Sequence, residues 1–363
     1  MGKNTTTSNM KKTVTIIALL ITLGTSAQTE VTNYKPGVNK EGVTYCLPKT
    51  LIKIKVNTTL ENYTPGEFSK YTERYLRLEG VDTEAHSEWK MNNIQVGITG
   101  VPDPNKIFTV KLKERTAAPL VTLTDDGILQ AINTSVMKKQ PQPEKRQEVV
   151  PRYNSKNFLT EEILMAGSTA KMAELTAKEI YNIRDSRNNI LRGQADSMPK
   201  DGDSMKFMVA QLDKQEAALM QLFTGYTEII DKSFDLNITP TDSIPHQVLF
   251  RFSKKLGVLD NSNLAGEPVY IDIQNEKMVP QPTTEEKNKK KLLGIVYNLP
   301  GKASVKVYQG KKIFYQGYLD LTQFGNTEIL DNDLFNKRMT TKVTFDSDTG
   351  AILKIDAEMP QSK

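Results

Sequence analysis

The sequence predicts a strand-rich α+β fold, in which antiparallel β-sandwich-like regions flank an antiparallel helical hairpin. Three observations predict it: helical periodicity within one central stretch, two-residue alternation of apolar side chains on both sides, and two turn sequences between alternating segments. The chain therefore divides into five predicted parts. They are a signal peptide (1–27), an N-terminal β region (28–137), a Pro-rich linker (138–159), the helical hairpin (160–225) and a C-terminal β region (226–363).

The helical hairpin is predicted from apolar residues spaced three and four apart, which fall on one side of a helix while polar residues take the other. The apolar side of the first helix holds Ile163, Ala166, Ala170, Ala173, Ala177, Ile180, Ile183, Ile190 and Leu191. After a break at 198–202, the second helix continues through Met205, Met208, Val209, Leu212, Leu219, Leu222 and Phe223. Gly225 supplies a stop signal, so the two helices are expected to fold back on each other.

Three charged residues interrupt the apolar sides: Arg184 and Arg187 in the first helix and Glu216 in the second. A turn centred near residues 198–200 brings Arg184 level with Glu216, so these charges are expected to meet. A guanidinium can hold a carboxylate through two hydrogen bonds, and such a pair can fix how two helices align. The alternative is that the two arginines bind an anionic ligand. The structural interpretation is favoured.

Alternation predicts strands on both sides of the helices. Apolar and polar residues alternate at 52–56, and further strands are predicted at 94–99 and 106–112. Helical spacing at 65–78 predicts a short helix among them. Two hairpins are predicted at the turn sequences Asp125-Asp126-Gly127 and Ser347-Asp348-Thr349-Gly350.

The N-terminus has the pattern of a secretory signal peptide. Two lysines precede an apolar run at 14–23, and Thr25-Ser26-Ala27 supplies the small residues of a cleavage site. The apolar run is about half as long as a membrane-spanning helix requires. Cleavage after Ala27 leaves Gln28 where a lipoprotein would carry cysteine, so neither a membrane span nor a lipid anchor is expected in the mature chain.

Charge and cysteine content narrow the classes of partner and chemistry. The formal charge of +5 falls to +2 once the leader and its three lysines are removed. A near-neutral chain lacks the concentrated basic face that nucleic acids require, so no nucleic-acid partner is predicted. The only cysteine, Cys46, cannot form an internal disulfide, and its apolar neighbours favour a small core residue over a nucleophile.

Sequence motifs that carry chemistry are nearly absent. The two histidines, His86 and His246, are far apart, and no His or Cys spacing typical of zinc surrounds them. No serine lies in a G-x-S-x-G motif, and no glycine-rich phosphate loop occurs. The stretch 346–350 resembles part of a calcium loop but lacks the downstream glutamate, so a β-turn is favoured. The sequence therefore predicts no catalytic residue, no metal and no cofactor.

Four stretches carry a family resemblance: GVTYCLPKT (42–50), IYNIRDSR (180–187), LAGEPVYID (264–272) and residues 332–353, which end in FDSDTGAIL. They resemble an uncharacterised family, a domain of unknown function, of exported Bacteroidales proteins of similar length. The resemblance covers essentially the whole mature chain and implies a periplasmic or envelope location in a Gram-negative bacterium. It implies no activity, cofactor or catalytic residue.

Two functions from different classes remain. The favoured one is a non-catalytic binding or assembly component of the periplasm or cell envelope, with an unknown protein or glycan partner that the helical hairpin contacts. The other is an unrecognised periplasmic hydrolase acting on glycan or peptide. The scarcity of His, Cys and Trp favours the first. An uncovered apolar face on the helices would support it, whereas paired carboxyl groups in a cleft, one with a raised pKa, would support the hydrolase.

Overall fold

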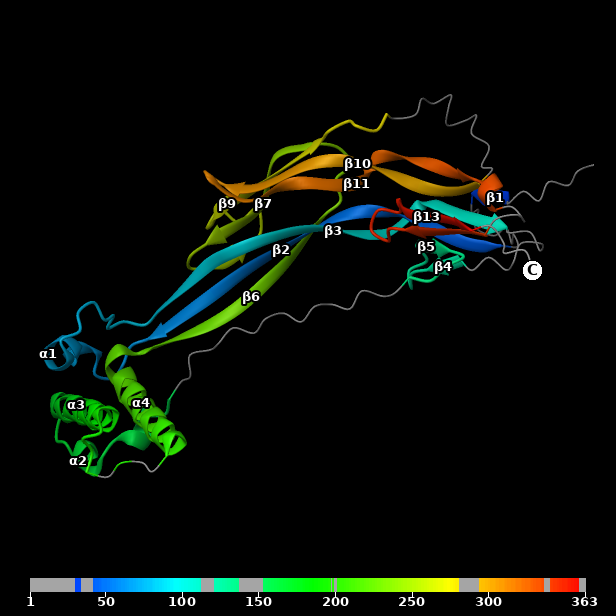
Figure 1. The fold of residues 1–363 in the computed structure, drawn as a ribbon. Helices are drawn as coiled ribbons and strands as arrows, with labels where there is room; N and C mark the ends of the chain where they lie inside the picture. The colour runs from blue at the N-terminus through cyan, green and yellow to red at the C-terminus, as the bar shows by residue number, and fades with distance from the viewer. Residues whose placement is uncertain are drawn as a thin grey trace, which may run out of the picture.

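The structure, a computed structural model, describes residues 30–33, 42–111, 121–136, 153–196, 198, 201–280, 294–335 and 340–358. Within these residues, an elongated β body carries a helical unit at one end (Figure 1). The strands form three antiparallel sheets, and two long helices pack together in the helical unit. The predicted strand-rich α+β class is therefore confirmed.

Strands from both predicted β regions are mixed within the sheets. The first sheet has the order β1 (Glu30–Asn33), β3 (His86–Lys111), β2 (Val43–Thr64) and β6 (Tyr226–Ile238). The second has the order β11 (Lys312–Asp331), β10 (Gly294–Gln309), β9 (Glu267–Asn275), β7 (Ile244–Ser253) and β8 (Gly257–Leu259). The third has the order β13 (Ile352–Glu358), β12 (Thr340–Phe345), β5 (Leu129–Ile132) and β4 (Val121–Leu123). Because β6 pairs with β2 and β12 pairs with β5, the two regions share sheets.

Two separate cores lie along the β body, and the long strands β2 and β3 contribute to both. Their apolar residues alternate with polar ones, so one face of each strand is buried. The end core contains Tyr45, Leu47, Phe108, Val110, Leu129, Ile132, Ile295, Val296, Leu330, Phe335, Val343 and Phe345. The middle core, between the first and second sheets, contains Ile52, Ile54, Val56, Ile94, Phe250, Val269, Ile271, Ile273, Ala303, Val305, Val307, Leu321 and Phe324.

Two predictions for the N-terminal β region differ from the structure. The strands predicted at 94–99 and 106–112 belong to the single strand β3, whose last residue is Lys111; residue 112 lies outside the described residues. The prolines between them interrupt the alternation without ending the strand, because residues 103–106 bulge out opposite one residue of β2. The helix predicted at 65–78 is shorter, consisting of η1 (Ser69–Tyr71) and α1 (Thr72–Leu76).

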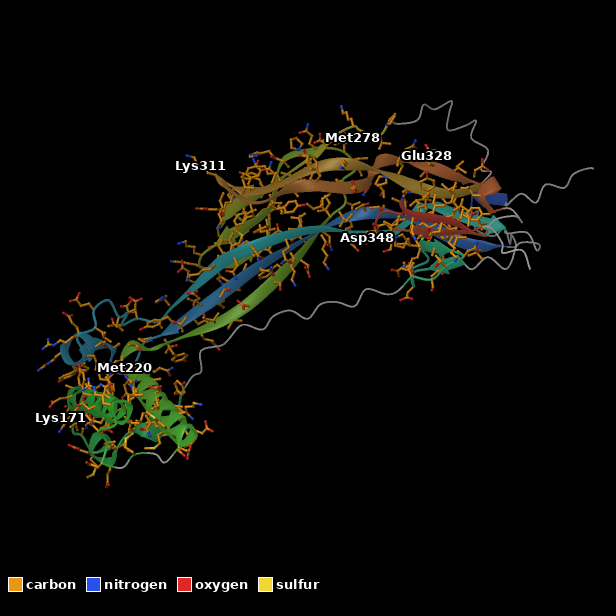
Figure 2. All side chains as sticks on the ribbon, in the orientation of Figure 1. Lys171, Met220, Met278, Lys311, Glu328 and Asp348 are labelled. Atoms are coloured by element: carbon orange, nitrogen blue, oxygen red, sulfur yellow. The ribbon has the colours of Figure 1, made fainter. Side chains whose placement is uncertain are left out.

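The turn between β12 and β13 docks into the middle of the body (Figure 2). The Asp346 carboxylate accepts hydrogen bonds from the backbone N–H groups of Asp348 and Thr349, at 2.7 and 3.3 Å. The Asp348 carboxylate in turn accepts one from the N–H of Gly100 on β3, at 3.1 Å. Backbone amides therefore engage both carboxylates, as expected for an aspartate-stabilised turn. Both predicted hairpins, this one and that of β4 and β5, are confirmed.

The helical unit confirms the predicted hairpin. α3 (Thr169–Arg192) and α4 (Gly202–Thr224) are preceded by capping residues, Ser168 and Asp201, whose side chains accept backbone N–H groups of the first turn. α3 ends at Gly193, whose φ of 70° is left-handed. The first predicted helix is divided: Ile163 lies in a short α2 (Glu161–Leu164), and Ala166 lies in the non-helical connection between α2 and α3. The helical core contains Phe68, Leu76, Ala173, Ala177, Ile180, Ile183, Leu219 and Phe223.

Part of the predicted linker belongs to the helical unit. Residues 138–152 of the linker, like the predicted signal peptide, lie outside the described residues. The last residues form η2 (Ser155–Phe158), where the Ser155 hydroxyl donates to the Ala218 carbonyl of α4 at 2.7 Å. Among the described residues, no helix has the length and apolar character needed to cross a membrane.

Candidate functional site

The predicted charge cluster joins the two long helices. α3 presents Arg184 and Arg187, and α4 presents Asp213 and Glu216. Arg184 Nε donates to Glu216 Oε1 at 2.6 Å, which confirms the expected contact. Arg187 Nη1 donates to Glu216 Oε2 and to Asp213 Oδ1, both at 2.7 Å. Glu216 therefore uses both carboxylate oxygens, and its side chain is only 13% exposed.

The electrostatics of this cluster favour the structural interpretation of the arginines. Two carboxylates face two guanidinium groups, so the cluster has no surplus positive charge for an anion. The hydrogen bond to Asp213, together with the nearby Glu216, raises the pKa of Arg187 above its usual value. An anion would have to displace carboxylates that are already well placed. The interpretation of Arg184, Arg187 and Glu216 as residues that fix the helix register stays a prediction.

Within the described residues, the helical core covers only part of the apolar sides of α3 and α4. Phe68 and Leu76 belong to the helical core and cover α3 and α4 near the β body. At the opposite end of the pair, four large apolar side chains among the described residues are exposed, and we call this set the hairpin tip. It consists of Leu191 (57% exposed), Met198 (41%), Phe207 (65%) and Met208 (39%). Leu191 and Met208 continue the apolar sides that are buried elsewhere in the pair, so the tip is an exposed apolar surface of the kind that partners cover.

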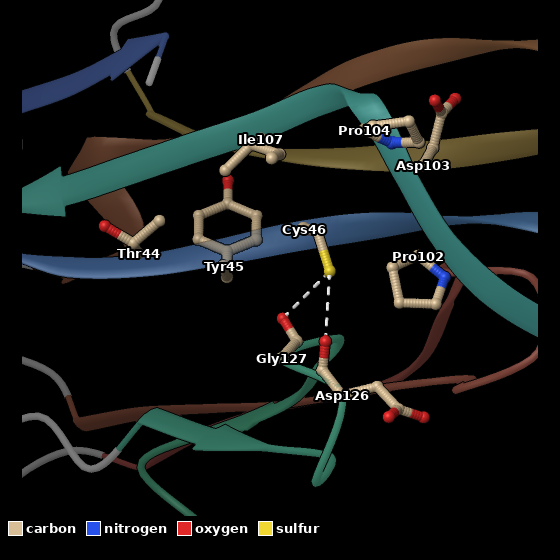
Figure 3. Close-up of a pocket in the computed structure, with 9 residues that line it drawn as sticks. All are labelled: Thr44, Tyr45, Cys46, Pro102, Asp103, Pro104, Ile107, Asp126 and Gly127. Carbon is tan, nitrogen blue, oxygen red and sulfur yellow. Dashed lines mark hydrogen bonds between the residues drawn. The ribbon is translucent and has the colours of Figure 1, made fainter. Parts of the chain in front are cut away.

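A shallow pocket lies over Cys46 in the β body (Figure 3). Its volume is about 320 Å³, and the bulged part of β3 supplies one wall through Pro102, Asp103 and Pro104. The turn between β4 and β5 supplies another wall through Asp126 and Gly127. The bulge thus holds β3 away from this turn and leaves the space between them open.

The surroundings of the Cys46 thiol in this pocket disfavour its ionisation. It donates a hydrogen bond to the Gly127 carbonyl at 3.2 Å and lies 3.7 Å from the Asp126 carbonyl. Burial, with a further contribution from nearby aspartates, raises the pKa of Cys46 above its usual value. A nucleophilic cysteine needs a lowered pKa, because the thiolate is the reactive form. These features fit the prediction of a small core residue.

The structure brings together a polar aromatic cluster that the sequence did not indicate. His246 on β7 stacks on Tyr270 of β9, with ring centroids 4.1 Å apart and an interplanar angle of 12°. Its Nδ1 lies 2.7 Å from the Tyr308 hydroxyl on β10, and that hydroxyl lies 3.4 Å from Asp272. Alternation at 269–273 predicts that Tyr270 and Asp272 share a face of their strand. No sequence signal placed His246 beside them.

The other histidine and the remaining acidic residues form no metal site in the part of the chain that the structure describes. His86 is exposed, with its Nδ1 3.8 Å from Asp82, and lies beside the ring of Tyr63. No group of three or more His, Cys, Asp or Glu side chains within the described residues is arranged to hold a metal ion.

The fold and these sites belong to a protein family without an assigned activity. The family model described as a domain of unknown function, DUF4831, matches residues 41–353, and the chain therefore belongs to that family. No curated protein and no solved structure matches the chain.

Proposed function

We propose that this chain is a non-catalytic binding or assembly component of the cell envelope or periplasm, and that its helical unit docks a protein partner through the hairpin tip. One observation carries the proposal: Leu191 and Met208 stay exposed where the apolar sides of α3 and α4 continue beyond the helical core, and Phe207 is exposed next to Met208. Exposed apolar surface of this kind is costly in water unless something covers it. The β body holds the helical unit far from the end of the body where β4, β5 and β13 lie (Figure 1).

The alternative function, a periplasmic hydrolase acting on glycan or peptide, has less support. The thiol in the pocket over Cys46 has a raised pKa. The two carboxyl groups that line the pocket, those of Asp103 and Asp126, come from different walls (Figure 3). Among the described residues, the carboxyl groups with shifted pKa values are Asp201 and Asp260, and both pKa values are lowered because backbone N–H groups donate to the ionised forms. A glycosidase acid needs the opposite shift.

Docking at the tip is tested with a double variant, Leu191→Ser with Phe207→Ser. Both side chains are exposed, so the fold should tolerate the change while the apolar surface is lost. We expect the partner recovered with the tagged mature chain, after cross-linking in cells, to fall about tenfold. Lys178→Ser, an exposed change on α3, is the matched control and should leave recovery unchanged. Equal recovery with a folded double variant would contradict docking at the tip.

Export is tested independently of docking. The predicted cleavage leaves a mature chain that begins at Gln28 and carries no lipid. The intact mass of protein isolated from the envelope fraction should match residues 28–363 without modification. An uncleaved or acylated N-terminus would contradict the proposed route to the envelope.

A further inference from the structure

The aromatic cluster around His246 lies on the outer face of the second sheet. Val269, Ile271 and Val307 point into the middle core, so the residues that alternate with them face outward. Among these, Tyr270 and Tyr308 are directly opposite each other on β9 and β10, with ring centroids 5.7 Å apart. The cluster lies on strands of the β body, whereas the hairpin tip lies on the helices.

The backbone of His246 adopts an unfavourable conformation in this cluster. Its φ of 49° is left-handed, which a residue with a Cβ rarely adopts. The register of β7 against β9 shifts at this point, and the His246 N–H donates to the Asp272 carboxylate at 2.6 Å rather than to the ladder. His246 is exposed, so the core does not require this conformation. Strained residues and bulges of this kind concentrate at binding sites, where they aim a side chain.

Polar groups of both signs surround the rings. Asp272 and Lys306 are opposite each other on β9 and β10, and the Lys306 ammonium lies 5.0 Å from the centre of the Tyr308 ring. An anionic ligand would meet the Asp272 carboxylate, and a cationic ligand would meet the Lys306 ammonium. The cluster therefore suits an uncharged ligand that has an apolar face and many hydroxyl groups.

We infer that His246, Tyr270 and Tyr308, with Asp272 and Lys306, form a binding site for a neutral oligosaccharide. The C–H groups on a pyranose face are weakly positive, and aromatic rings attract them through their negative faces. Sugar hydroxyls both donate and accept, so they can donate to Asp272 and accept from Lys306.

The inference is tested by titrating the mature chain calorimetrically with maltotetraose and with tetra-N-acetylchitotetraose, two soluble neutral oligosaccharides. We expect at least one to bind, with a dissociation constant below about 1 mM. Tyr270→Ala and Tyr308→Ala should each weaken that binding about tenfold. Tyr181→Ala, which removes an exposed tyrosine from α3, should leave it unchanged.

A further variant separates binding from folding. His246→Gly removes the ring but accepts the left-handed φ without strain, so the melting temperature should hold or rise while sugar affinity falls. The inference is overturned if neither sugar binds the unaltered chain at about 10 mM. It is also overturned if folded Tyr270→Ala and Tyr308→Ala chains bind as well as the unaltered chain.

Discussion

Tyr45 ties β2 to β10 inside the end core through both functions of its hydroxyl group. The hydroxyl donates to the Val296 carbonyl at 3.1 Å and accepts from the Val296 N–H at 3.0 Å. Its ring is buried and packs near Phe108. One side chain therefore satisfies both the N–H and the carbonyl of Val296, and removing its hydroxyl group leaves both of them unpaired.

Replacing Tyr45 with Phe should lower the free energy of unfolding at neutral pH by about 1–3 kcal/mol, the usual cost of unpaired buried polar groups. Burial also raises the pKa of Tyr45 above its ordinary 10.0, so the folded chain keeps a proton that the unfolded chain loses. Stability should therefore fall as pH rises above 10.0, and this fall should be shallower in Tyr45→Phe. Urea unfolding at neutral pH and at about pH 11 measures both effects. Identical alkaline slopes would contradict the assignment.

The coupling between Arg184 and Glu216 can be measured with a double-mutant cycle. Arg184→Met and Glu216→Gln should each destabilise the chain, and the coupling energy should be about 1–2 kcal/mol, because partial exposure screens the pair. The exposed pair Lys171 and Glu174 is the control and should show negligible coupling. Absence of coupling would return Arg184 and Arg187 to consideration as ligand residues.

The helical pair is the element whose sequence pattern was most informative. Its apolar spacing, capping residues and terminal glycine agree with one another. For this reason the two helices, and the contact between Arg184 and Glu216 across them, could be predicted. The strand pattern was less informative, because Pro102 and Pro104 hide the continuity of β3. The His246 cluster could not be predicted, since a left-handed residue at a register shift breaks the alternation on which strand predictions depend.

Packing between α3 and α4 predicts unequal costs for two truncations. Ile180 is fully buried, so Ile180→Ala should cost about 2–4 kcal/mol. Leu212 is only partly buried against the helical core, so Leu212→Ala should cost less. Lys178→Ala on the exposed side of α3 should change stability by less than about 0.5 kcal/mol. Chemical denaturation of the three variants tests the order, and an equal cost for Ile180→Ala and Lys178→Ala would contradict the packing.

The β body is built by pairing between strands that lie far apart in the sequence. β6 pairs with β2 although the helical unit lies between them in sequence, and β12 pairs with β5 across an even longer separation. Local sequence patterns predict where each strand lies but not which strand it pairs with. The pairing of strands from the two predicted β regions within the same sheets therefore could not be predicted. The turn at 346–350 joins these parts by docking against β3.

Docking of this turn is tested at two glycines of β3. A Cβ at Gly100 would clash with the backbone of Ser347 and Asp348, whereas a Cβ at Gly97 would meet nothing within 4 Å. Gly100→Ala should therefore lower the free energy of unfolding by about 1–3 kcal/mol, the range for overpacking. Gly97→Ala should be neutral or slightly stabilising. Thermal unfolding of both variants distinguishes them, and equal melting temperatures would show that the turn does not dock there.

The proposal that the hairpin tip docks a protein partner is tested by site-specific photo-cross-linking in cells. A photoreactive residue is placed at Leu191 or Phe207 in the tip, and at Lys178 or Tyr318 as exposed controls on α3 and β11. We expect both tip positions to form an adduct with the same protein, and the Leu191 adduct to disappear when Phe207→Ser is added. Neither control should form that adduct. No adduct at the tip, or the same adduct at all four positions, would contradict the claim.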